Sequence, residues 1–167
     1  MPDGFNDYFN LTLAIPFVAW VTAQVTKLIG GYLRLRRWDW GFFVRSGGMP
    51  SAHTALVTSL ATTVGFLEGF NSTLFGATVV VALIVMYDAA GVRRAVGVQA
   101  GILNRILREL KDRRPKEVEH DVRELLGHTP IQVFYGAMVG VLVAVLGLWL
   151  AAEANVIEPV FFLPRSG

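Results

Sequence analysis

Four apolar segments constrain what this chain can fold into more than any other feature. They cover residues 11–29, 52–67, 73–87 and 131–152. A helix needs about 20 mainly apolar residues to span a bilayer, so the first and the last segment are long enough. The two middle segments reach that length if their polar ends, at His53 and Asp88, lie at the membrane boundary. The pattern predicts transmembrane helices at about residues 9–30, 51–68, 73–92 and 130–152.

The composition indicates a membrane protein and excludes several other classes. Hydrophobic residues make up 53% of the 167 positions and charged residues 17%, against about a quarter charged in an ordinary soluble domain. These values exclude a disordered chain, a charged coiled coil and most cytosolic enzymes. The lack of cysteine excludes disulfides, thiolate metal sites and a cysteine nucleophile. A net charge of +2 is too small to indicate nucleic-acid binding. We expect one all-α membrane domain over residues 1–167, a bundle of about four transmembrane helices.

The basic residues predict how the chain is oriented. Of the 15 lysines and arginines, 13 lie within residues 30–50 and 92–130, and the other two are Lys27 and Arg165. Loops rich in these residues face the cytoplasm, so both termini are expected outside it, in an inner or plasma membrane. Apolar side chains recur at helical spacing in residues 96–112 and again after Pro115. They predict two short amphipathic helices in the cytoplasmic loop, lying at the membrane surface.

Two histidines are expected at the same depth, each beside the start of a helix. His53 closes the sequence Gly-Gly-Met-Pro-Ser-Ala-His, in which Pro50 is expected to start the helix. A helix N-terminus favours an anion, although a glycine turn with Ser51 as a cap is an equal interpretation. His128 precedes Thr129-Pro130-Ile131-Gln132, a capping box. A metal site is an alternative for the histidines, but the ligand spacing typical of one is missing.

Charged residues at the cytoplasmic ends of the segments add to these two histidines. Asp88 ends the third segment and is followed by Arg93 and Arg94. A carboxylate at the membrane edge is costly without partners, so it indicates function. Lys27, near the end of the first segment, is either a phosphate ligand or a side chain that snorkels to the interface. Together these residues predict a phosphate site at a membrane surface.

Three blocks, in this order, resemble the divergent small branch of the type 2 phosphatidic acid phosphatase superfamily, which also includes vanadium haloperoxidases. They are Gly-Gly-Met-Pro-Ser-Ala-His, Val-Met-Tyr-Asp-Ala-Ala-Gly-Val-Arg-Arg and Leu-Leu-Gly-His-Thr-Pro. The resemblance covers about residues 24–140. It implies a helical enzyme that needs no metal or other cofactor and cleaves phosphate monoesters through a phosphohistidine.

The resemblance also implies roles for the two histidines. His128 corresponds to the nucleophile, and Pro50-Ser51-Ala52-His53 matches the motif whose histidine protonates the leaving group. The residue four positions after His128, which orients the nucleophile in the superfamily, is Gln132 in place of a carboxylate. Asp88 is the candidate substitute for that carboxylate.

The phosphate ligands implied by the resemblance match the superfamily pattern in part. Lys27 and Arg34 have the superfamily's spacing, but Leu35 stands where it has proline. Ser51 lies in the second motif. The serine-arginine pair of the third motif is missing, so Arg93 or Arg94 is expected to replace its arginine, and Arg123 is one position out of register.

The sequence therefore predicts a lipid-phosphate phosphatase with its site facing the cytoplasm. Phosphatidylglycerol phosphate, phosphatidic acid and isoprenyl phosphates are the candidate substrates. The alternative is a non-catalytic membrane subunit or anionic-lipid-binding protein that retains the phosphate pocket, which Gln132 favours. A transporter is disfavoured because the polar residues gather at one surface and not at the midplane. Glycine pairs at 65/69, 97/101 and 136/140 permit close helix packing, within one chain or in a homodimer.

Overall fold

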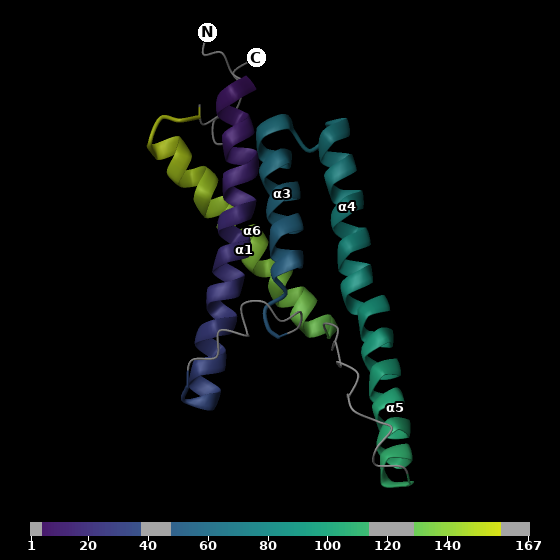
Figure 1. Ribbon diagram of the computed structural model, residues 1–167. Coiled ribbons are helices and arrows are strands. Elements are labelled where there is room, and N and C mark those ends of the chain that lie inside the picture. Colours follow the sequence, from purple (N-terminus) through teal and green to yellow (C-terminus); the bar gives the residue numbers. More distant parts are fainter. Residues whose placement is uncertain (1–4, 38–47, 114–128, 158–167) are drawn as a thin grey trace.

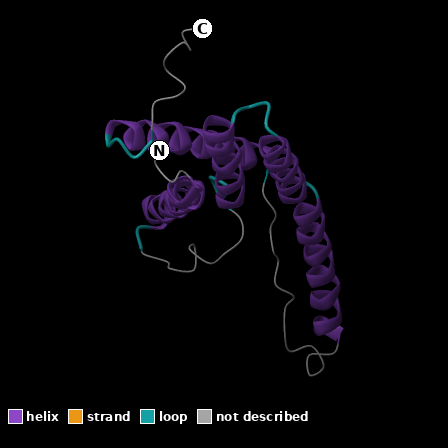
Figure 2. Ribbon diagram, turned by 90° about the horizontal axis from the view of Figure 1, so that it is seen from above, coloured by secondary structure: helices purple, strands orange, loops and turns teal. Residues whose placement is uncertain are grey.

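The structure of the protein is a computed structural model that describes residues 5–37, 48–113 and 129–157. Within these ranges every regular element is a helix (Figures 1 and 2). The helices are α1 (Phe5–Leu35), α3 (Ala52–Glu68), α4 (Thr73–Ala90), α5 (Val92–Arg113) and α6 (Pro130–Glu153). The all-α prediction is therefore confirmed for the described part of the chain.

Within the described residues, three helices are long and apolar enough to cross a membrane. They contain the stretches Leu11–Arg34, Thr73–Ala90 and Pro130–Glu153, at three of the four places where spans are predicted. α3 has 17 residues, which at 1.5 Å per residue gives about 26 Å, slightly less than the roughly 30 Å of the hydrocarbon core. A fourth span at α3 therefore stays a prediction.

α3 is the central helix of the bundle. It contacts α1, α4 and α6, and Figure 1 shows it between α1 and α4 with α6 crossing behind. Its buried side chains are small: Ala52, Thr54, Ala55, Val57, Ser59, Ala61, Thr63 and Val64. Small residues allow helix backbones to approach closely, so this composition suits a helix enclosed by three neighbours.

One glycine pair explains the close crossing of α6 over α3. A Cβ placed on Gly136 would lie 2.5 Å from the carbonyl oxygen of Ser51. A Cβ on Gly140 would collide with the Thr58 hydroxyl and the Ala55 carbonyl oxygen. Close packing is thus confirmed for the 136/140 pair. In the 65/69 pair, Gly65 is closely packed, because a Cβ there would lie 2.6 Å from the ring of Phe70. Gly69 ends α3 as its C-cap, at a φ of 94°, and lies outside the helix.

Side-chain caps define where α3 and α4 start. Ser51 caps α3 by accepting the N–H of Thr54, and Ser72 caps α4 by accepting the N–H of Phe75. The expectation that Pro50 starts α3 is wrong, because Ser51 supplies the capping oxygen and Ala52 is the first helical residue. The alternative that Ser51 is a cap is confirmed.

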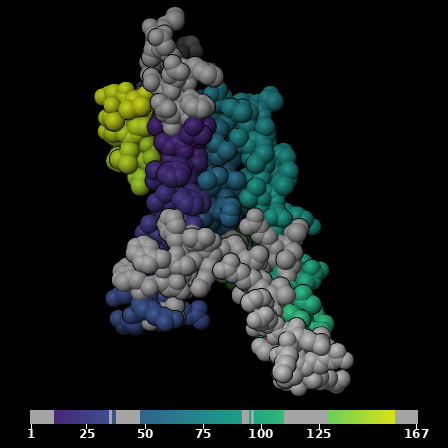
Figure 3. Space-filling model, viewed as in Figure 1, coloured from purple at the N-terminus to yellow at the C-terminus, as the bar shows by residue number. Residues whose placement is uncertain are grey.

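α5 follows α4 directly and leaves the bundle. Only Gly91 separates them, and its N–H donates to the carbonyl oxygen of Tyr87. Figures 1 and 3 show α5 continuing beyond the start of α3. The helix predicted at 96–112 thus starts four residues earlier, at Val92. Its position on a membrane surface stays a prediction, and the second amphipathic helix, after Pro115, lies outside the described residues.

Candidate functional site

The candidate site lies at the end of the bundle where α3 and α6 begin. In Figure 1 this is the lower end, where α1 and α4 finish. Ser51, the cap of α3, donates its backbone N–H to the carbonyl oxygen of Gln132, in the first turn of α6, at 3.0 Å. Two helix N-termini therefore meet at one place. Each carries a partial positive charge from its backbone dipoles, so their meeting point is electrostatically suited to an anion.

Lys27 is a basic side chain near this junction. Its side chain is buried, and its Nζ donates to Oε1 of Gln24 at 2.9 Å. Gly48 lies against its aliphatic stem, because a Cβ on Gly48 would be 3.7 Å from Cδ of Lys27. A snorkelling lysine would extend its ammonium to the surface, so that alternative is wrong for Lys27. The glycine loop, the segment that contains Gly48 just before α3, is thereby brought together with the end of α1.

Gln24 is a member of this site that the sequence reasoning missed. It is buried and lies one helical turn before Lys27 on α1. The available signal was its position, since it is a polar residue inside an apolar segment, three residues from a cation on the same helix face. A neutral amide oxygen helps to hold a buried ammonium without neutralising it.

Gln132 stabilises the start of α6. Its Oε1 accepts the backbone N–H of Thr129 at 3.0 Å, while the Thr129 hydroxyl accepts the N–H of Gln132. The predicted capping box is confirmed. Its orienting action on the nucleophile stays a prediction, because His128 lies outside the described residues.

The other predicted site residues are described to different extents. His53 lies in the first turn of α3 with an exposed side chain, and Arg34 is exposed in the last turn of α1. Asp88 is half-buried in the last turn of α4. Arg93 and Arg94 are in the first turn of α5, and the structure describes their backbone alone. Arg123 lies outside the described residues, as His128 does.

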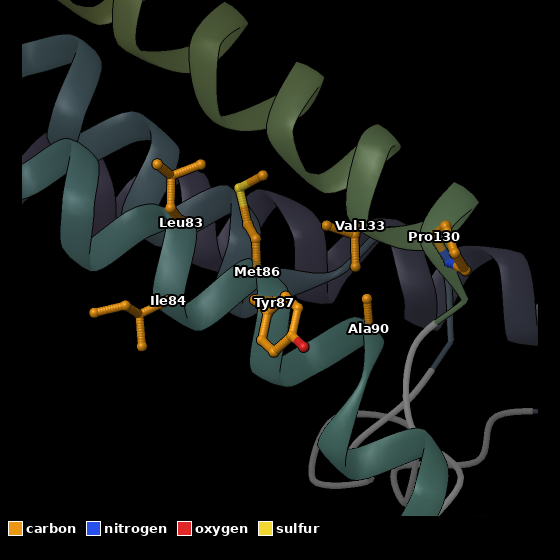
Figure 4. A pocket seen from close by; sticks show the side chains of 7 residues that line it. All are labelled: Leu83, Ile84, Met86, Tyr87, Ala90, Pro130 and Val133. Carbon is orange, nitrogen blue, oxygen red and sulfur yellow. The ribbon is translucent and has the colours of Figure 1, made fainter.

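An apolar groove runs between the last turns of α4 and the first turn of α6 (Figure 4). Its volume is about 600 Å³. Met86 and Ala90 of α4 point toward α6, and Val133 points back toward α4. Pro130, the first residue of α6, closes one end of the groove, and Leu83 lies toward the other end. The groove therefore ends where the anion-favouring junction begins.

Potential metal ligands do not gather in the described ranges. Within residues 5–37, 48–113 and 129–157, no three side chains of histidine, aspartate or glutamate lie close enough to hold an ion together. His128 lies outside these ranges.

Comparison with known proteins gives the family. The family model described as the Divergent PAP2 family matches residues 8–143, which is most of the chain. The chain belongs to this family. The match includes Lys27, the glycine loop, Asp88 and the start of α6, so the resemblance inferred from the three sequence blocks is confirmed.

One curated relative in the comparison is a membrane protein of Bacillus subtilis (strain 168), YuiD, described as uncharacterized. It is 39% identical to this chain over 147 residues, which cover 82% of this chain and 93% of the relative. A membrane location is supported jointly by this relative and by the three apolar helices. No solved structure matches the chain.

Proposed function

We propose that the protein is a membrane-bound phosphatase that hydrolyses a lipid phosphomonoester. The observation that carries this proposal is the junction of α3 and α6, where Ser51 donates to Gln132 and the buried ammonium of Lys27 lies nearby. Membership of the Divergent PAP2 family and helices suited to a bilayer support it. A phosphate ester bound at this junction would keep its hydrocarbon part within reach of the membrane.

In the proposed reaction His128 and His53 divide the chemistry. A neutral imidazole nitrogen of His128 attacks phosphorus in line with the ester oxygen, a P–N bond forms and the P–O ester bond breaks. His53 gives its proton to the departing alkoxide. Water then attacks the phosphohistidine while His53 takes up a proton from it, and inorganic phosphate leaves with His128 restored. Charge stabilisation at the phosphoryl oxygens provides most of the rate enhancement in such reactions.

The proposed phosphate ligands lie on α1, at the cap of α3 and in the first turn of α5. Lys27 contributes a point charge, and Arg34, Arg93 or Arg94 could contribute bidentate contacts. Ser51 holds the first turn of α3 in place, because its hydroxyl accepts from both the N–H and the hydroxyl of Thr54. Asp88, half-buried in α4, is the carboxylate proposed to orient a histidine.

The proposed substrate is a lipid phosphate of the cytoplasmic leaflet. The distribution of basic residues supports this, because it predicts that the end of the bundle with Lys27 and the start of α3 faces the cytoplasm. Phosphatidylglycerol phosphate, phosphatidic acid and isoprenyl phosphates share the phosphomonoester and the apolar chain that such a site requires.

A non-catalytic protein that binds anionic lipids is the second candidate. The observation that favours it is the capping box, since Oε1 of Gln132 is engaged by the backbone of Thr129. A glutamine also cannot stabilise an imidazolium as a carboxylate would.

Phosphate release from a panel of lipid phosphates, in detergent, tests the proposal. We expect release from at least one of the three candidate substrates, unchanged by a chelator and inhibited by vanadate, which resembles five-coordinate phosphorus. Tight lipid-phosphate binding without release would favour the second candidate. Loss of activity in chelator, restored by a divalent ion, would overturn the phosphohistidine mechanism.

A further inference from the structure

The groove between α4 and α6 has the position and lining of a site for a hydrocarbon chain. Six of the seven residues that line it, Leu83, Ile84, Met86, Ala90, Pro130 and Val133, have side chains without hydrogen-bonding groups, and the seventh is Tyr87 (Figure 4). Both helices that form it are candidate membrane spans. Its volume of about 600 Å³ falls in the range of small-molecule sites. Because both helices are suited to a bilayer, a groove between them would face the lipid.

The groove is also continuous with the anion-favouring junction. Pro130, at one end of the groove, is the first residue of α6, and Gln132 in the same turn accepts the N–H of the α3 cap. At the other end, Leu83 lies seven residues before Ala90, a rise of about 10 Å along α4. A molecule that fits both regions has an anionic group at one end and an apolar chain at the other.

We infer that this groove holds a hydrocarbon chain of the phosphate-bearing lipid, which enters sideways from the bilayer between α4 and α6. The inference rests on the proposed function and adds to it, because it names the residues that select for chain length. The phosphate lies at the start of α6 and the chain runs from Pro130 toward Leu83. Chains that reach Leu83 gain contacts that short chains do not make.

Leu83→Trp tests the inference, with Val80→Trp as the matched control. Both positions are on α4 and similarly exposed, at 58% and 55%, but only Leu83 lines the groove. The probe is dipalmitoyl phosphatidic acid with a photoreactive diazirine midway along one chain. We expect labelling to concentrate in residues 83–90 and 130–133. We expect Leu83→Trp to reduce it about tenfold, as for lost burial of about two methylene groups, and Val80→Trp to leave it unchanged.

Three results would overturn the inference. They are even labelling of all lipid-facing helices, equal labelling of both variants, and equal competition by dipalmitoylglycerol, which has no phosphate. The chain has no cysteine, so Leu83→Cys is a single probe for another occupant. Rapid oxidative formation of a Leu83→Cys dimer in membranes, unaffected by the lipid, would assign the groove to a second copy of the protein.

Activity measurements separate this inference from the proposed function. If both hold, Leu83→Trp lowers kcat/KM for dipalmitoyl phosphatidic acid and leaves that for the dibutyryl analogue unchanged. Groove labelling without phosphate release from any lipid phosphate would refute the phosphatase and keep the lipid groove. If the protein releases phosphate and Leu83→Trp changes kcat/KM by the same factor for both chain lengths, the groove is refuted and the phosphatase is kept.

Discussion

Gln132 has one role that the structure shows, in capping α6, and one that is proposed, in orienting His128. Its oxygen accepts the N–H of Thr129 and so stabilises the first turn of α6. The same residue stands four positions after His128, where the superfamily has a carboxylate. Because glutamate also completes a capping box, the two roles can be tested independently of each other.

We expect Gln132→Glu to preserve the stability of the protein and to retain or raise its phosphatase activity, because a carboxylate both caps the helix and stabilises an imidazolium. Gln132→Ala removes the hydrogen bond from the Thr129 N–H to the Gln132 side chain and leaves Thr129 as the N-cap, so it should lower the free energy of unfolding by about 1 kcal/mol. Thermal unfolding in detergent, together with kcat for each variant, measures both effects. A stable Gln132→Glu variant without activity would contradict the orienting role.

The two histidines are expected to differ in how they depend on the leaving group. His53→Ala should strongly reduce hydrolysis of alkyl phosphates and spare an activated aryl phosphate, whose leaving group needs little protonation. His128→Ala should abolish both reactions. In the unmodified protein kcat/KM should follow a bell-shaped pH profile, because His128 must be neutral and His53 protonated. Equal losses on both substrates for His53→Ala would contradict its role as the acid.

At the scale of the helices, contacts within one turn were predictable from the sequence and contacts between helices were not. Thr129 and Gln132 form their capping box within one turn, so their spacing alone defined it. The hydrogen bond between Ser51 and Gln132 joins residues far apart in the chain. The sequence around each residue does not predict this contact. The burial of Lys27 likewise depends on Gln24 and the glycine loop packing together.

The crossing of α6 over α3 gives the prediction at this scale. Gly140→Ala should destabilise the bundle, because its Cβ would collide with backbone and side-chain atoms of α3. Overpacking of this kind typically costs about 1–3 kcal/mol. Gly76→Ala is the matched control, since nothing lies within 4 Å of a Cβ at that position on α4. A Gly140→Ala protein that unfolds at the same temperature as Gly76→Ala would contradict the close crossing.

At the scale of the whole molecule, the alternation of helix directions agrees with the distribution of basic residues. α1 and α4 end at the same side of the bundle where α3 and α6 begin (Figure 1). The stretches that follow α1 and α4 carry nearly all the lysines and arginines. The order of the apolar segments and the positions of the basic residues along the chain were sufficient to predict that these four helix ends share one side. The orientation in a membrane is a separate prediction, because the same fold could be inserted in either direction.

We expect a reporter fused after Gly167 to be extracytoplasmic and one inserted in residues 111–116 to be cytoplasmic, as the positive-inside rule requires. Alkaline phosphatase and green fluorescent protein fusions, which are active on opposite sides of the membrane, make the measurement. The reverse pattern would exclude substrates of the cytoplasmic leaflet.

Trapping of the phosphoenzyme tests the central claim most directly. The purified protein is mixed with a lipid phosphate labelled at phosphorus, quenched rapidly in base, and analysed for bound label. A phosphohistidine should appear as base-stable, acid-labile label on the unmodified protein and should be missing from His128→Ala. If His128→Ala still binds label and still releases phosphate, His128 is not the nucleophile and the proposed mechanism is wrong.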